Sequence, residues 1–108
     1  MNVEELKYRL REIFGEQVLF NKEFDDYAIT IKNLDVNLVM WCQKVKEEEI
    51  KPVPTKDKQN LIFIKKIGSS NRCIVIKINN GEFKEVHLGD HKYYDEIRKR
   101  FGIKQSSY

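Results

Sequence analysis

The first pattern of apolar and polar positions along the chain predicts an amphipathic helix over residues 2–14. Asn2 can cap its first turn, and Glu5 follows three residues later, as in a capping box. Gly15 supplies a stop signal directly after the last apolar position. The apolar residues that share one stripe of this helix are Val3, Leu6, Leu10, Ile13 and Phe14.

Two short β segments and a second helix are predicted next. Residues 18–20 suit a short strand or a bridge, and residues 27–31 alternate in a way that predicts a strand. A helix is predicted over residues 34–49, capped by Asn33 or Asp35 and ended by the prolines that follow. Its apolar face consists of Leu34, Leu38, Trp41 and Val45, and the prolines are Pro52 and Pro54 in the linker KPVPTKDKQN.

From residue 61 the apolar period changes from 3.6 to 2, which predicts an antiparallel meander. The predicted strands are 61–67, 72–78 and 82–88, joined by turns at 68–71 and 79–81 and ended by Gly89. A closing helix is predicted over 91–101, with Tyr94, Ile97 and Phe101 inward and Gly102 as its stop. We therefore expect an α+β domain, with an antiparallel sheet and the helices packed on one of its faces.

Composition narrows the class of protein. Hydrophobic residues make up 41% and charged residues 34% of the 108 residues, which is typical of one globular domain over residues 1–108. No apolar run approaches the roughly 18 residues of a membrane span, and the N-terminus does not have a signal-peptide pattern. We expect a cytoplasmic protein without a membrane partner. Cys42 and Cys73 fit no metal-binding spacing, so we expect free, half-buried thiols and neither metal nor cofactor.

Charge is unevenly distributed along the chain. Residues 61–108 contain ten Lys or Arg and five Asp or Glu, whereas residues 1–60 contain ten and twelve. The half that forms the predicted meander is therefore basic. Such asymmetry favours a polyanionic partner such as RNA, although surplus lysine also serves simply as a solvated surface.

Two stretches of the basic half together form one pattern of strand, turn and helix signals. They are KKIGSSNRCIVIKI and EVHLGDHKYYDEIRK. A strand opens on Arg after a Ser/Gly turn, and a later strand runs into a Gly-x-His-x-x-Tyr helix start. This arrangement resembles the RelE/ParE toxin superfamily, the small ribonuclease or gyrase-directed toxins of type II toxin–antitoxin systems. The likeness covers roughly residues 27–101, and the helix 2–14 lies outside it.

The resemblance implies RNA or the ribosome as target, an antitoxin protein as partner, and roles for particular residues. The residues that it implies as catalytic are Arg72, His91 and Tyr94, and those that it implies as RNA-binding are Lys65, Lys66, Lys92 and Tyr93. One departure is that Asp90 and Asp95 flank the key stretch, where negative charge would repel phosphate.

These residue types also suit RNA cleavage on chemical grounds. Cleavage by the 2′-hydroxyl needs a proton acceptor and a cation on the phosphate, roles that His91 and Arg72 could take. Each residue also has a structural alternative. His91 could cap a helix, His87 could simply face the sheet, Tyr94 could be core, and Arg72 could pair with Glu82 or Glu85. Lys65 and Lys66 point to opposite faces of a strand, so only one can reach a given ligand.

Three hypotheses follow from the sequence. The first is a RelE/ParE-like, metal-independent endoribonuclease that acts on mRNA. The second is a non-catalytic module of the same fold that binds nucleic acid or protein. The third is a small self-associating protein in which the charge asymmetry has no function.

Overall fold

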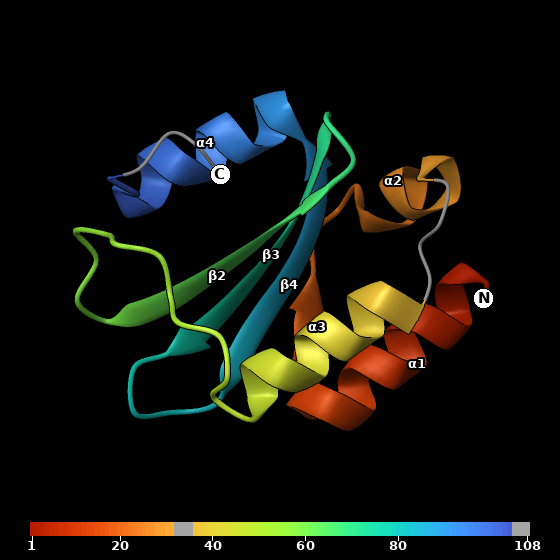
Figure 1. Cartoon of the computed structure of the whole chain (residues 1–108), viewed down its shortest axis with the longest axis horizontal. Helices are drawn as coiled ribbons and strands as arrows, with labels where there is room; N and C mark the ends of the chain where they lie inside the picture. Colours follow the sequence, from red (N-terminus) through yellow and green to blue (C-terminus); the bar gives the residue numbers. More distant parts are fainter. Residues whose placement is uncertain (32–35, 105–108) are drawn as a thin grey trace.

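The computed structural model describes residues 1–31 and 36–104 of the chain. Within these residues, four helices pack around one sheet of four strands. Figure 1 shows the twisted sheet with α1 and α3 on one side and α4 on the other. The elements are α1 (Val3–Phe14), β1 (Leu19–Phe20), α2 (Phe24–Thr30), α3 (Val36–Lys46), β2 (Asn60–Ile67), β3 (Asn71–Ile78), β4 (Phe83–Asp90) and α4 (His91–Phe101).

Both long N-terminal helices follow the predicted apolar stripes. The Asn2 side chain accepts a hydrogen bond from the Glu5 amide at 2.8 Å, which confirms the predicted cap of α1. α3 is shorter than predicted, and it buries Leu38 and Val45 while Trp41 is only half-buried. The predicted residues Asn33, Leu34 and Asp35 lie outside the described residues.

The predicted meander is confirmed, and it forms most of the sheet. β2 pairs antiparallel with β3, and β3 pairs antiparallel with β4. The predicted end of the last strand at Gly89 is wrong, because β4 continues through Gly89 to Asp90. The α+β class is confirmed as well, although the sheet is not purely antiparallel.

The exception is β1, which pairs with β4 in parallel and makes the sheet order β1-β4-β3-β2. The side chain of Asn21 extends this short ladder beyond Phe20. Its amide nitrogen donates to the Leu88 carbonyl at 2.9 Å, and its oxygen accepts from the Leu88 amide at 3.0 Å. A side-chain amide thus replaces a backbone peptide at the end of β1.

Each face of the sheet has its own apolar core. Cys73 and Val75 point into a core built with α1, α2 and α3, whereas Ile74 and Ile76 point into a second core built with α4. The expectation that all helices pack on one face is therefore wrong for α4. Because β3 is covered on both faces, its central residues Cys73–Ile76 are all apolar and do not alternate with polar residues.

The strand predicted over residues 27–31 is also wrong, because Phe24–Thr30 forms helix α2. The buried residues in this segment are Phe24, Ala28 and Ile31, and their spacing of four and three residues is that of a helix. Ile29, whose alternation favoured a strand, is 74% exposed. None of the helices in residues 1–31 and 36–104 is long and apolar enough to span a membrane.

Candidate functional site

Helix α4 positions most of the residues singled out from the sequence. Asp90 caps it, since its carboxylate accepts from the Tyr93 amide at 2.9 Å. Gly102 ends it in a left-handed conformation with φ of 62°. The helix is thereby held across the sheet with the ring of Tyr94 inward and several basic side chains outward.

The three residues implied as catalytic do lie in one row. The guanidinium of Arg72 lies 5.8 Å from the centroid of the Tyr94 ring, and that ring meets the His91 ring edge-on at 5.7 Å. However, Arg72 is 4% exposed and Tyr94 is not exposed at all. Neither side chain can contact RNA without rearrangement of the core, and only His91 reaches solvent, beside Asp95 at 3.5 Å.

Arg72 is held mainly by packing. Its Nη1 donates to the Asn71 carbonyl at 2.9 Å, while its buried Nε has no hydrogen-bond partner among the described residues. The alternative that it pairs with Glu82 or Glu85 is wrong, because neither carboxylate forms an ion pair with it. Its cation–π contact with Tyr94 therefore joins β3 to α4.

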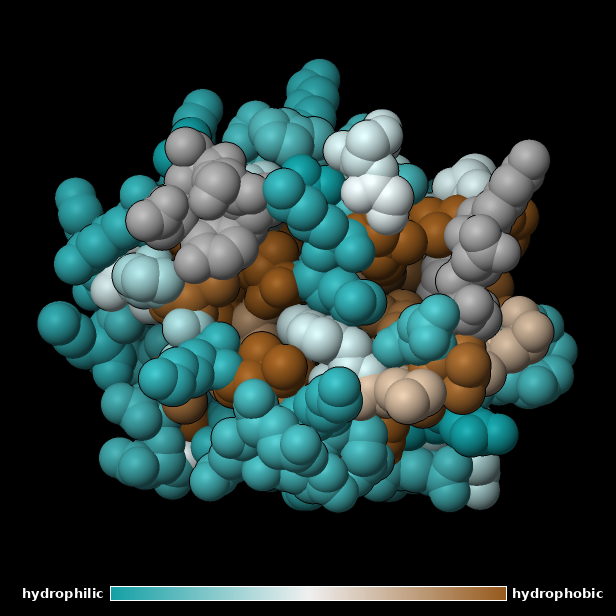
Figure 2. Space-filling model, viewed as in Figure 1, coloured by the Kyte–Doolittle hydropathy of each residue, from teal (hydrophilic) through white to brown (hydrophobic). Residues whose placement is uncertain are grey.

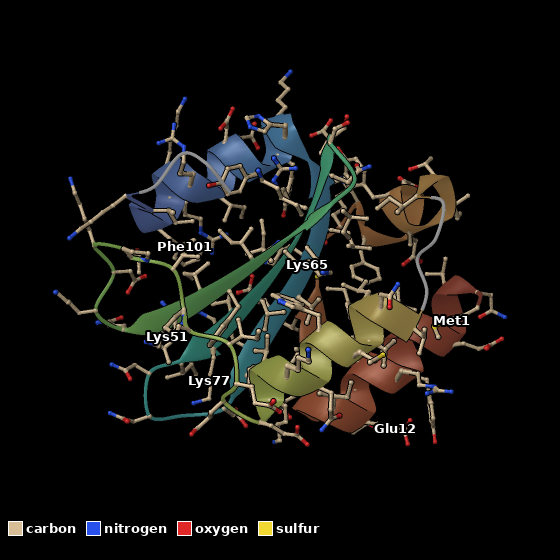
Figure 3. All side chains as sticks on the ribbon, viewed as in Figure 1. Met1, Glu12, Lys51, Lys65, Lys77 and Phe101 are labelled. Atoms are coloured by element: carbon tan, nitrogen blue, oxygen red, sulfur yellow. The ribbon has the colours of Figure 1, made fainter. Side chains whose placement is uncertain are left out.

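The lysines implied as RNA-binding are divided between the two faces of the sheet. Lys66 lies opposite Arg72 in the sheet register, so it belongs to the α4 side, where it is exposed. Lys65 lies opposite Cys73 and belongs to the α3 side, as the alternation predicts. Figure 3 labels Lys65 between β2 and α3. Lys92 is exposed in the first turn of α4, so it shares the α4 side with Lys66.

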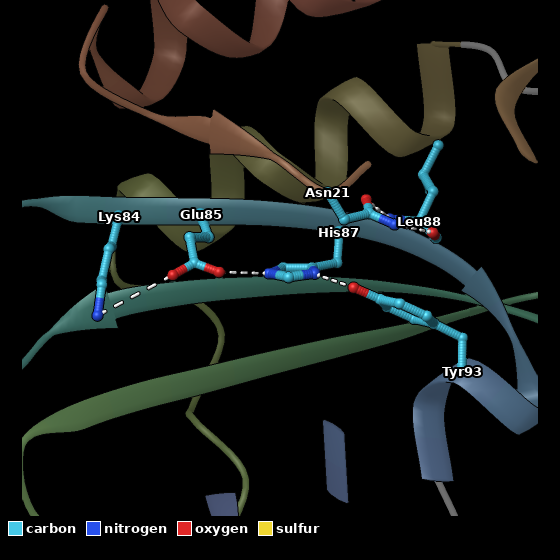
Figure 4. A network of polar contacts seen from close by, with 6 residues as sticks. All are labelled: Asn21, Lys84, Glu85, His87, Leu88 and Tyr93. Carbon is cyan, nitrogen blue, oxygen red and sulfur yellow. Dashed lines mark hydrogen bonds and ion pairs between the residues drawn. The ribbon is translucent and has the colours of Figure 1, made fainter. Parts of the chain in front are cut away.

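A polar network that the sequence did not single out connects β4 to α4 (Figure 4). The two ring nitrogens of His87 lie 2.6 Å from the Tyr93 hydroxyl and 2.7 Å from a carboxylate oxygen of Glu85. Glu85 and His87 are two residues apart on β4 and therefore share a face. In the sequence, this network is indicated only by the spacing of Glu85 and His87 and by Tyr93, which follows Gly89 closely.

The hydrogen bonds fix which group carries each proton. A carboxylate only accepts, so Nε2 of His87 donates to Glu85 and Nδ1 accepts from the Tyr93 hydroxyl. Burial lowers the pKa of His87 in spite of the neighbouring Glu85 carboxylate. Burial, with the charges of Glu23 and Glu85, raises the pKa of Tyr93 to about 12. At neutral pH the network is therefore a neutral phenol, a neutral imidazole and a carboxylate.

This network predicts a pH dependence of stability. Because the pKa of His87 is lower in the folded chain than its ordinary 6.5, the unfolded chain takes up the proton first as the pH falls. The stabilisation is complete above pH 6.5 and decreases below it, with a slope of up to about 1.4 kcal/mol per pH unit. Urea unfolding between pH 7.5 and 5 measures the slope.

The matched control is His87→Gln, which should remove most of this slope. The charged and titratable groups around His87 are Glu85 on β4, Tyr93 and Arg100 on α4, and Glu23 before α2. Asp57, whose pKa is lowered by hydrogen bonds from Asn60 and Gln59, affects stability only near and below its ordinary 3.8. An equal slope in the wild type and the variant would contradict the assignment to His87.

Among the described residues, no group of three His, Cys, Asp or Glu side chains could hold a metal ion. No protein-family model matches the chain, and no curated protein or solved structure shows significant similarity to it.

Proposed function

We propose that the protein is a RelE/ParE-like cytoplasmic protein that binds RNA through the solvent face of α4. The observation that carries this proposal is the division of α4 into an apolar stripe on the sheet and an outward face rich in cations. The exposed cations on or beside this face are Lys66, Lys92, Lys99 and Arg100. None of the four forms an ion pair with another described residue.

Two of the three residues that the resemblance implies as catalytic are buried, which favours RNA binding over RNA cleavage as the function. Arg72 and Tyr94 belong to the core, so the RNA contacts are assigned to the outer residues of α4 and to Lys66. Unpaired cations on a helix contact phosphates without reading the base sequence. An antitoxin-like protein with an acidic segment would compete for the same surface.

A second candidate function, metal-independent RNA cleavage, is favoured by the hydrogen-bonded order Tyr93, His87, Glu85. A hydroxyl beside a base that is oriented by a carboxylate is an arrangement suited to proton transfer. Tyr93 can accept the proton of a ribose 2′-hydroxyl while it passes its own proton to His87. The 2′ oxygen then attacks phosphorus and the bond to the 5′ oxygen breaks, which leaves a 2′,3′-cyclic phosphate. A water molecule protonates the 5′ oxygen and takes up the proton held by His87, so the network returns to its starting state.

The test is binding of a fluorescent 20-nucleotide single-stranded RNA at several salt concentrations. We expect the variant Lys99→Glu/Arg100→Glu to bind about tenfold more weakly and to lose about one to two units of the logarithmic salt slope. The matched control, Arg9→Glu/Lys44→Glu, makes the same charge change on α1 and α3 and should bind as the wild type. Equal losses of RNA affinity in both variants, or an affinity that does not depend on salt, would contradict RNA binding through the solvent face of α4.

Incubation of the same RNA, with and without ribosomes, tests the second candidate. Cleavage that is lost in Tyr93→Phe but kept in Tyr8→Phe, with unchanged RNA affinity, would support the relay. Tyr8 is a suitable control because it is 62% exposed on α1. Intact RNA with the wild-type protein would exclude cleavage and leave the binding proposal standing.

A further inference from the structure

A small cavity lies on the opposite side of the sheet from the α4 surface. It has a volume of about 240 Å³ and lies where the end of α3 and the following segment cover one end of β2, β3 and β4. Figure 2 shows apolar surface between hydrophilic side chains in the region where β2 approaches α3. The residues that line the cavity are Val45, Lys46, Glu48, Ile50, Lys51, Pro52, Leu61, Phe63, Lys77 and Phe83.

The apolar wall and the charged rim of this cavity come from different elements. Leu61, Lys77 and Phe83 are direct neighbours across three strands, so a lysine stands in an apolar row. The ammonium groups of Lys46 and Lys77 lie 5.8 and 5.7 Å from the centroid of the Phe83 ring. Both distances are within the reach of a cation–π contact. Lys51 adds a third ammonium group to the rim.

The rim has an excess of positive charge. Of its four charged residues only Glu48 is acidic, and within the described residues none of the four forms an ion pair. Glu48 has a φ of 63°, a conformation in which glycine is usual. An apolar hollow surrounded by three unneutralised ammonium groups is complementary to an anion that has an apolar body.

We propose that this cavity binds a small amphipathic carboxylate, with its hydrocarbon body against Phe63 and Phe83 and its carboxylate among the three lysines. At about 30 Å³ per water-sized group, the volume accommodates about eight such groups, which is the size of hexanoate. Burial of its carbon chain corresponds to a Kd of about 1 mM. This site is separate from the α4 surface, and it does not depend on RNA binding.

The experiment compares sodium hexanoate, 1-hexanol and sodium acetate as probes of the intact protein by two-dimensional NMR at constant ionic strength. Hexanoate should shift resonances of the residues that line the cavity in a saturable manner, and the other two probes should bind at least tenfold more weakly. Equal affinity for 1-hexanol, or shifts located at α4, would overturn the proposal.

Charge variants test the role of the rim. The double variant Lys46→Glu/Lys51→Glu changes exposed side chains and should weaken hexanoate binding about tenfold. Lys77→Met, which removes the ammonium group of a half-buried side chain, should weaken binding by a similar factor. The matched control Lys44→Glu, on α3 but outside the cavity, should bind normally. Glu48→Gly removes the single carboxylate and relieves its backbone conformation, so it should bind more tightly without loss of stability. Unchanged affinity in the double variant would overturn the assignment.

Discussion

Tyr94→Ala is expected to lower the free energy of unfolding by about 3–5 kcal/mol, as large aromatic truncations in cores do. The Tyr94 side chain is fully buried between the sheet and α4, and its ring also carries the cation–π contact with Arg72. Its removal would leave a cavity and a buried guanidinium with fewer contacts. Because small domains are stable by only about 5–15 kcal/mol, this loss should be plain in urea unfolding.

Tyr94→Phe is the matched control for this prediction. It keeps the ring between Arg72 and His91 and removes only the hydroxyl group, so the loss should be much smaller than that of Tyr94→Ala, at about 1 kcal/mol. RNA affinity of the folded Phe variant should equal that of the wild type. A Tyr94→Ala variant of unchanged stability that no longer binds RNA would show instead that the ring contacts RNA.

The fold was predictable where local periodicity and burial coincide. α1 buries Leu6, Leu10 and Phe14 of its predicted stripe, and the three strands of the meander pair in the predicted antiparallel order. The strand predicted over residues 27–31 is wrong because Tyr27, Ile29 and Ile31 alternate as in a strand, whereas the buried residues Phe24, Ala28 and Ile31 have helical spacing. A chain segment with both patterns is decided by tertiary contacts, which a single sequence does not show.

The placement of α4 was not predictable for a similar reason. The residues of β2 and β3 are apolar on both faces, and only the observed burial shows that Ile74 and Ile76 need a helix of their own. The resemblance implies a catalytic role for Tyr94, whereas its spacing to Ile97 and Phe101 predicts a core position. The structure places it in the core.

The Glu85, His87, Tyr93 network shows the limit of sequence reasoning about the site. Its position in the strand pattern predicts that His87 faces the sheet, and His87 does lie on a sheet face, where it is 4% exposed. Its functional interest arises from the phenol that α4 brings over it, which depends on the path of the chain between residues 87 and 93. That path passes through a glycine at which a side chain would collide with Tyr93.

Gly89→Ala is therefore the second substitution with a large expected effect, about 2–3 kcal/mol of lost stability. A Cβ atom at this position would lie 2.4 Å from Cδ2, 2.6 Å from Cγ and 2.7 Å from Cβ of Tyr93. These atoms include the base of the Tyr93 side chain, so the first turn of α4 must move. We expect loss of the His87–Tyr93 hydrogen bond and a weaker dependence of stability on pH.

A double-mutant cycle with Tyr93→Ala separates this collision from a general effect of alanine in β4. If the ring is the obstacle, its removal makes Gly89→Ala much less harmful, and the two losses should be less than additive by about 1–2 kcal/mol. Urea unfolding of the four proteins at pH 7.5, where His87 is neutral, measures the coupling. Losses that add to within about 0.5 kcal/mol would mean that Gly89 is required for some reason other than the close approach of Tyr93.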